Sequence, residues 1–139
     1  MSNLERFLYV QNRTHDEVVE EIRSGKKVSH WMWYTFPQIQ GLGESDFAVF
    51  YAIDDIDEAK RYLKHEVLGP RLKKLAKELL ILKTNDPIEI FGKLDSLKLR
   101  SSMTLFDCVE SNGIFKEVLD KYYQGEKDEL TIKILERKK

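Results

Sequence analysis

Two segments of this 139-residue chain hold residues whose types and spacing could bind or transform a ligand. The first runs from Ser29 to Gln38 and places a histidine among large aromatic side chains. His30 could donate to an anion or act as an acid or base, and Trp31 or Trp33 could stack on a flat ring. The alternative is that these aromatic residues are core, with His30 bonded to a backbone carbonyl.

The second segment runs from Lys98 to Asp107, where Ser101 and Ser102, which are mediocre helix formers, stand between apolar residues. In a helix, Lys98 and the two serines would cluster at spacings of three and four. Hydroxyl groups beside Lys98 and Arg100 would suit a phosphate or another anion. The alternative is that Arg100 pairs with a carboxylate such as Asp107, and that the small serines allow close helix packing.

A third candidate is Arg71, which follows Gly69 and Pro70. A helix that starts here leaves backbone N–H groups free near the guanidinium, and these could contact an anion. The alternative is that the Gly-Pro turn only starts the helix.

Other chemistries have little support in the sequence. Ser101 or Ser102 could form a catalytic triad with His30 and Asp107, but no Gly-x-Ser-x-Gly turn is present. The three histidines and the single cysteine lack the spacing of metal ligands, and neither a Walker loop nor Gly-x-Gly-x-x-Gly occurs. We therefore expect neither a metal nor a cofactor.

Composition narrows the class of protein further. The 23 Lys and Arg residues nearly balance the 24 Asp and Glu residues, which argues against a generic nucleic-acid binder. The length suits one domain spanning residues 1–139, and 42% hydrophobic residues can supply its core. No apolar run approaches the roughly 18 residues of a membrane span, and the N-terminus does not resemble a signal peptide. We expect a cytoplasmic protein that does not bind membranes.

The elements that must position these residues are helical in pattern, and we predict an all-α, compact multihelical domain of about seven helices. Asn3 caps a predicted short helix, and a capping box of Thr14 and Glu17 opens a second one through Ile22. The clearest pattern runs from Leu68 to Leu82, with Pro70 in the first turn.

Helices also dominate the second half of the chain. Asp86 and Pro87 predict a short helix that ends at Gly92, and a longer helix is expected over 94–109. Another helix should begin at Ser111 or Asn112 and end at Gly125. A last helix, or else a strand, covers 130–135. Residues 27–53 form an irregular, aromatic-rich segment, within which 46–53 could be strand or helix.

Several motifs repeat the pattern of a known family: Ser29-His30-Trp31-Met32-Trp33, Phe36-Pro37-Gln38, Val67-Leu68-Gly69-Pro70-Arg71-Leu72 and the run from Lys98 to Phe106. Over nearly its whole length the chain resembles a bacterial and fungal family of unknown function, whose members are often labelled calpastatin-like. The resemblance implies a mainly α-helical single domain and brings no established activity. Calpastatin is an extended inhibitor that orders on its target, a mode that the many aromatic residues here do not fit.

These observations lead to two hypotheses. In the first, the protein binds a small anionic or phosphate-bearing, nucleotide-like ligand and could act on it. Lys98, Arg100 and Arg71 would neutralise the ligand, Ser101 and Ser102 would hydrogen-bond to it, and His30 would be its acid or base. This hypothesis predicts that His30 lies near Arg100. In the second, the protein is a non-catalytic interaction module whose aromatic residues are core or an exposed apolar patch. The oligomeric state stays open.

Overall fold

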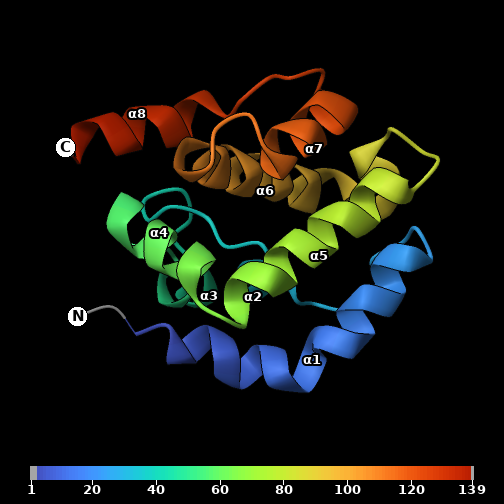
Figure 1. Cartoon of the computed structure of the whole chain (residues 1–139), viewed down its shortest axis with the longest axis horizontal. Coiled ribbons are helices and arrows are strands. Elements are labelled where there is room, and N and C mark those ends of the chain that lie inside the picture. Colours follow the sequence, from blue (N-terminus) through green and yellow to red (C-terminus); the bar gives the residue numbers. More distant parts are fainter. Residues whose placement is uncertain (1–2, 139) are drawn as a thin grey trace.

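Eight helices surround one apolar core in the computed structural model, which describes residues 3–138 (Figure 1). In chain order they are α1 (Glu5–Arg23), α2 (Met32–Thr35), α3 (Asp46–Phe50), α4 (Ile56–Lys64), α5 (Leu68–Ile81), α6 (Pro87–Val109), α7 (Ile114–Tyr123) and α8 (Glu129–Arg137). The prediction of an all-α domain is confirmed. Figure 1 shows α8 lying along α6 at one edge of the molecule and α1 at the opposite edge.

The first helix differs from the prediction of two separate helices. Residues Glu5–Arg23 form one element, and Thr14 lies inside it rather than at a cap. Its hydroxyl donates to the carbonyl of Val10, one turn earlier, a bond that tends to bend helices. Figure 1 shows α1 changing direction near its middle. The Thr14–Glu17 spacing was misleading because the Glu17 carboxylate instead lies beside the Ser29 hydroxyl, with an oxygen–oxygen distance of 2.7 Å.

Helix α5 begins at Leu68 as predicted, and a glycine determines how closely it packs against α4. The Asp55 side chain caps α4 by accepting from the N–H of Glu58. Gly69, in the first turn of α5, lies so close to the end of α4 that an added Cβ would be 2.1 Å from the Leu63 carbonyl oxygen. Only glycine therefore allows this approach.

Helix α6 contains the break that the sequence predicts. Asp86 caps its start by accepting from the N–H of Ile88 at 2.9 Å. Gly92 then leaves the helical conformation, with φ 81° and ψ 169°, and a new helical stretch starts behind it. Because φ is positive, a residue with a side chain would be strained here.

The last two helices close the fold over α6. Asp128 caps α8 by accepting from the N–H of Thr131, so the final element is the predicted helix and not a strand. Helix α7 begins at Ile114 and ends in a left-handed turn at Gln124 and Gly125. No helix among residues 3–138 is long and apolar enough to span a bilayer.

The segment 27–53 combines irregular backbone with two short helices, α2 and α3. Of the two alternatives for 46–53, the helix is confirmed as α3. Ile53, just after α3, forms an isolated parallel bridge with Ile39. Part of the segment is core, since Trp31 and Phe36 are fully buried. By contrast, Phe47 and Phe50 of α3 are more than half exposed.

Candidate anion-binding site

The two basic residues that the sequence places near the middle of α6 point to different faces of that helix. Lys98 lines a surface hollow together with His30 and Trp33. Arg100 lines another hollow, which is formed with residues 126–130 and Ile132. His30 therefore lies beside Lys98, and the prediction that it lies near Arg100 is wrong.

The hollow beside Lys98 has a volume of about 420 Å³ and lies between the loop after α1 and the break in α6. We call it the lysine hollow. Its lining is Lys27, His30, Met32, Trp33, Phe91, Gly92, Lys93, Leu94, Asp95 and Lys98. Three lysines and one histidine thus surround a space with a single carboxylate, and an anion would meet a positive potential there.

Asp95 is shared between two of the lysines. Its carboxylate pairs with Lys27 at 2.9 Å and with Lys98 at 3.2 Å. The Lys27 side chain is only 8% exposed, and its ammonium also donates to the Ser29 carbonyl. Lys93 makes no ion pair with any residue of the described part of the chain. The hollow therefore holds three lysines, and its one carboxylate pairs with two of them.

Trp33 forms the aromatic wall of the lysine hollow. The Lys98 ammonium lies 4.8 Å from the centroid of its ring, a cation–π contact, and the Phe47 ring lies 5.4 Å away. A long lysine side chain can keep its stem on such a ring while its ammonium group turns to an anion. For an anion in the hollow, the Lys98 ammonium would turn from Trp33 and Asp95 towards the ligand while its methylene stem stays near the ring.

The break at Gly92 adds backbone donors to the same hollow. The helical stretch that restarts after Gly92 begins at the floor of the hollow, where Lys93, Leu94 and Asp95 form its first turn. The first amides of a helix lack partners within the helix and favour negative charge. On the other side of the break, the Ile90 carbonyl accepts from the Lys27 N–H at 2.7 Å and ties the loop to α6.

Glu21 of α1 holds the loop that carries His30 and Trp33. One carboxylate oxygen accepts from the N–H groups of Val28 and Ser29 and from the Trp31 indole, while the other accepts from the Ser29 hydroxyl. Burial opposes ionisation, but these hydrogen bonds outweigh it and lower the pKa of Glu21 to about 2. In this segment, Val28, Ser29 and Trp31 face Glu21. His30 and Trp33 face the lysine hollow.

Trp31, unlike Trp33, is not available to a ligand. Its side chain is 1% exposed and packs against the rings of Phe36 and Phe91. His30, one residue earlier, is exposed at the rim of the lysine hollow. Of the aromatic residues singled out from the sequence, Trp33 is the one that the site uses.

Ser101 and Ser102 serve the packing of α6. Ser101 donates to the Asp128 carboxylate at 2.9 Å and so ties α6 to the start of α8. Ser102 is fully buried. Arg100 lies 3.9 Å from Glu126, and the expected pairing with Asp107 is not formed, because Asp107 pairs with Lys127 at 3.2 Å. This face of α6 matches the alternative interpretation of close helix packing.

Arg71 lies apart from both faces of α6. Its guanidinium donates to Asn12 at 2.8 Å and faces a cavity of about 10 Å³ between α1 and α5. A space of this size holds about one water molecule and no organic ligand. Burial and the charge of Arg71 lower the pKa of His15, which lines the same cavity.

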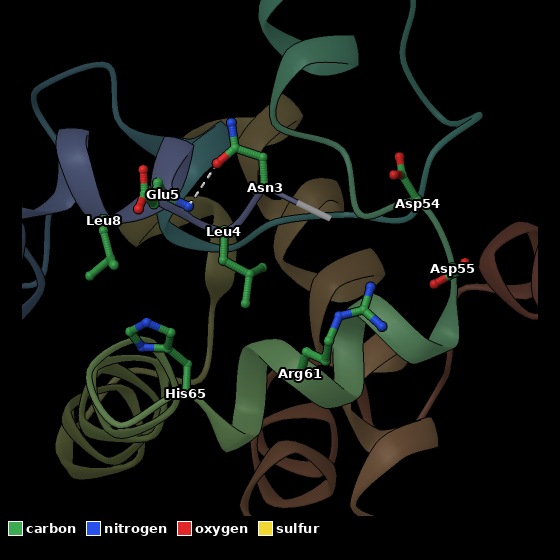
Figure 2. A pocket seen from close by; sticks show the side chains of 8 residues that line it. All are labelled: Asn3, Leu4, Glu5, Leu8, Asp54, Asp55, Arg61 and His65. Atoms are coloured by element: carbon green, nitrogen blue, oxygen red, sulfur yellow. Dashed lines mark hydrogen bonds between the residues drawn. The ribbon is translucent and has the colours of Figure 1, made fainter. Parts of the chain in front are cut away.

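A larger hollow lies elsewhere, where the start of α1 faces α4 (Figure 2). It measures about 940 Å³, but its side chains are spread around the rim, as Figure 2 shows. Several already serve the backbone: Asp55 caps α4, and Nδ1 of His65 accepts from the N–H groups of Val67 and Leu68. The lysine hollow is the better candidate because three of its four formally charged residues are lysines and they converge on one space.

Sequence reasoning missed Lys27, Gly92, Lys93 and Asp95 as site residues. The sequence did contain a signal for Gly92 and Lys93. Gly92 ends one predicted helix just before the next one, so a new helix start could have been expected there. Lys27 and Asp95 gave no such signal, because only the tertiary structure brings them together. Among residues 3–138, no group of His, Cys, Asp and Glu side chains is arranged to hold a metal ion.

Comparisons with known proteins extend the resemblance noted in the sequence. No curated protein matches the chain. A solved structure, that of the conserved hypothetical protein Rv1873 from Mycobacterium tuberculosis, is 46% identical, with a TM-score of 0.93 and 96% of each chain covered. The model of a family described as "Protein of unknown function (DUF1810)" matches residues 1–135. By this match the chain belongs to the DUF1810 family.

Proposed function

We propose that this protein binds a small anionic ligand, such as a phosphate-bearing molecule, in the lysine hollow. The observation that carries the proposal is the shared carboxylate: Lys27 and Lys98 both pair with Asp95, while Lys93 has no ion-pair partner among the described residues. An anion would complete the charge balance of this cluster. Hydrogen bonds to charged groups are among the stronger polar contacts, which suits a site built around ammonium groups.

Each part of the hollow has a proposed role. Lys93 and Lys98 bind the anion directly, and the helix start after Gly92 adds backbone donors. Lys27 is nearly buried and fixes Asp95 and the loop. His30 at the rim donates a hydrogen bond and is the group that would exchange a proton with a bound ligand. Trp33 supports Lys98 and offers its ring edge to the ligand.

Binding is tested by isothermal titration calorimetry with phosphate, pyrophosphate, nucleotides, NAD and ADP-ribose at low salt. We expect at least one compound to bind, with an affinity that falls as sodium chloride is raised. The double variant Lys93→Gln/Lys98→Gln should lose about tenfold or more in affinity.

The matched control is Lys77→Gln, which removes an exposed lysine from α5. Like Lys98→Gln, it lowers the net charge of the protein by one. Because Lys77 is not in the hollow, the variant should bind the ligand with nearly the affinity of the wild type. The proposal is overturned if no compound binds, or if the control loses as much affinity as a single Lys98→Gln variant.

A second candidate function is that of a protein-interaction module. The observation that favours it is the exposure of apolar side chains on α3, where Phe47, Val49 and Phe50 are 58%, 54% and 57% exposed. Contiguous exposed apolar surface often marks an interaction site. Under this function, Phe47→Ala/Phe50→Ala would abolish capture of a partner while leaving pyrophosphate binding unchanged.

A further inference from the structure

Exposed apolar side chains continue outward from the lysine hollow. Leu94, on the wall of the hollow, is 73% exposed. Trp33 lies between the hollow and α3, with its ring 5.4 Å from that of Phe47. Phe47 and Phe50 are three residues apart on one helical turn and are both exposed. We call Leu94, Trp33, Phe47 and Phe50 the apolar ledge.

The charge around this ledge changes along its length. The inner end is the lysine hollow, with Lys27, Lys93 and Lys98. The outer end carries the exposed residues Glu44 and Asp46, which lie three positions and one position before Phe47 in the chain. Between Val28 and Ala59 the sequence contains no lysine or arginine. Arg6 reaches the outer end, where its guanidinium donates to the Phe50 carbonyl at 2.9 Å, but it is nearly buried and pairs with Glu58 at 3.1 Å. A binding partner would therefore meet exposed positive charge at the inner end only.

We propose that the ligand of the lysine hollow is an amphiphile: an anionic head, such as a phosphate monoester, with an alkyl or aryl body that lies on the apolar ledge. This inference rests on the proposed function and adds the chemical class of the ligand. The head pairs with Lys93 and Lys98, and the body covers Trp33, Leu94 and Phe47, which otherwise face water.

A discrete molecule fits this surface better than an anionic membrane. A bilayer would cover both ends of the ledge at once, and its negative surface would repel Glu44 and Asp46. A single molecule with one charged end places its negative charge only among the lysines. The charge distribution therefore selects a free amphiphile over a lipid surface.

The inference is tested by calorimetry with inorganic phosphate and then ethyl, butyl and hexyl phosphate. Every methylene placed on the ledge should tighten binding by about two- to fourfold, because it leaves water for an apolar contact. Hexyl phosphate should therefore bind well over tenfold more tightly than phosphate. Hexanol, which lacks the anionic head, should not bind detectably at the same concentrations.

Two variants separate the head from the body. Phe47→Ala should flatten the chain-length series and leave phosphate affinity unchanged, whereas Lys98→Gln should weaken all members of the series by the same factor. Phe50→Ala repeats the first test at a second position of the ledge. Ile81→Ala, which removes an exposed apolar side chain at the end of α5, is the matched control and should change nothing. Circular dichroism checks that each variant is folded.

The outcomes distinguish this inference from the proposed function. If phosphate binds through the lysines but longer chains add nothing, the amphiphile is overturned and anion binding stands. If neither phosphate nor any alkyl phosphate binds, both are overturned. If vesicles of phosphatidylcholine and phosphatidic acid bind the protein while free hexyl phosphate does not, the choice of a discrete molecule is wrong.

Discussion

The loop from Lys27 to Trp33 separates two charged centres that differ in how fully the protein itself satisfies them. On one side, the Glu21 carboxylate accepts three N–H groups and one hydroxyl. On the other side, three lysines line a hollow with one carboxylate, Asp95. Buried polar groups are normally satisfied, so the first centre stabilises the fold. Under the proposed function, the second centre keeps binding capacity for a ligand.

The largest effect should come from removing the satisfied charge. We expect Glu21→Gln to lower the free energy of unfolding by about 3 kcal/mol, because the amide nitrogen cannot accept a hydrogen bond and would face donors of the loop. Urea denaturation measures the loss. Glu20→Gln, at the exposed neighbouring position, should change stability by less than about 0.5 kcal/mol. Equal effects in the two variants would mean that Glu21 does not hold the loop.

A smaller effect of the same carboxylate should appear as pH is lowered. The pKa of Glu21 is about 2 in the folded protein, against 4.5 for a glutamate without these partners. Its contribution is therefore fully present above pH 4.5 and is lost as the pH falls from 4.5 towards 2. The stability difference between wild type and Glu21→Gln should shrink over that range. A constant difference from pH 6 to pH 2.5 would contradict the assignment.

The unsatisfied centre is tested through its single carboxylate. Asp95→Asn should cost about 1–3 kcal/mol in unfolding free energy, because the nearly buried Lys27 loses its partner. The same change should raise the affinity for pyrophosphate about three- to tenfold, since Lys98 is released from its pairing with Asp95 and one negative charge leaves the hollow. Calorimetry at low salt measures the gain. A fall in affinity would show instead that Asp95 positions the lysines.

The smallest effect concerns the opposite face of α6. Ser101→Ala should cost about 1 kcal/mol, because it removes the hydrogen bond to Asp128 that ties α8 to α6. Pyrophosphate affinity should not change. Ser111→Ala, at an exposed position after the same helix, is the control. A loss of anion affinity in Ser101→Ala would place the ligand on the face beside Arg100.

Local signals in the sequence were sufficient for most helices. Asp55, Asp86 and Asp128 lie at helix starts where their side chains accept from backbone N–H groups. Of these three, only Asp86 was recognised from the sequence as the start of a helix. The Thr14–Glu17 spacing predicted a start that does not exist, because both side chains have other partners within α1 and the loop. A capping pattern inside an amphipathic stretch cannot show on its own whether the helix continues.

The site was less accessible to the sequence than the fold. The residue types alone singled out Lys98, His30 and Trp33. Which of the basic residues of α6 faces the loop with His30 depends on how the helix is rotated in the bundle, and this is Lys98 and not Arg100. Residues two apart on a helix point to nearly opposite sides, so Lys98 and Arg100 were unable to serve one ligand together. Lys27 and Asp95 lie 68 positions apart and meet only through the fold.

The different burial of the two tryptophans has a practical consequence for spectroscopy. Trp31 is enclosed by aromatic rings and bonded to Glu21, so its emission reports whether the core is intact. Trp33 borders the lysine hollow and carries a lysine on its ring, so its emission reports what occupies that hollow. Replacing either residue by phenylalanine leaves a protein with a single tryptophan, which can be excited selectively at wavelengths where the six tyrosines do not absorb. The chain thus contains one natural optical probe for folding and another for the proposed ligand site.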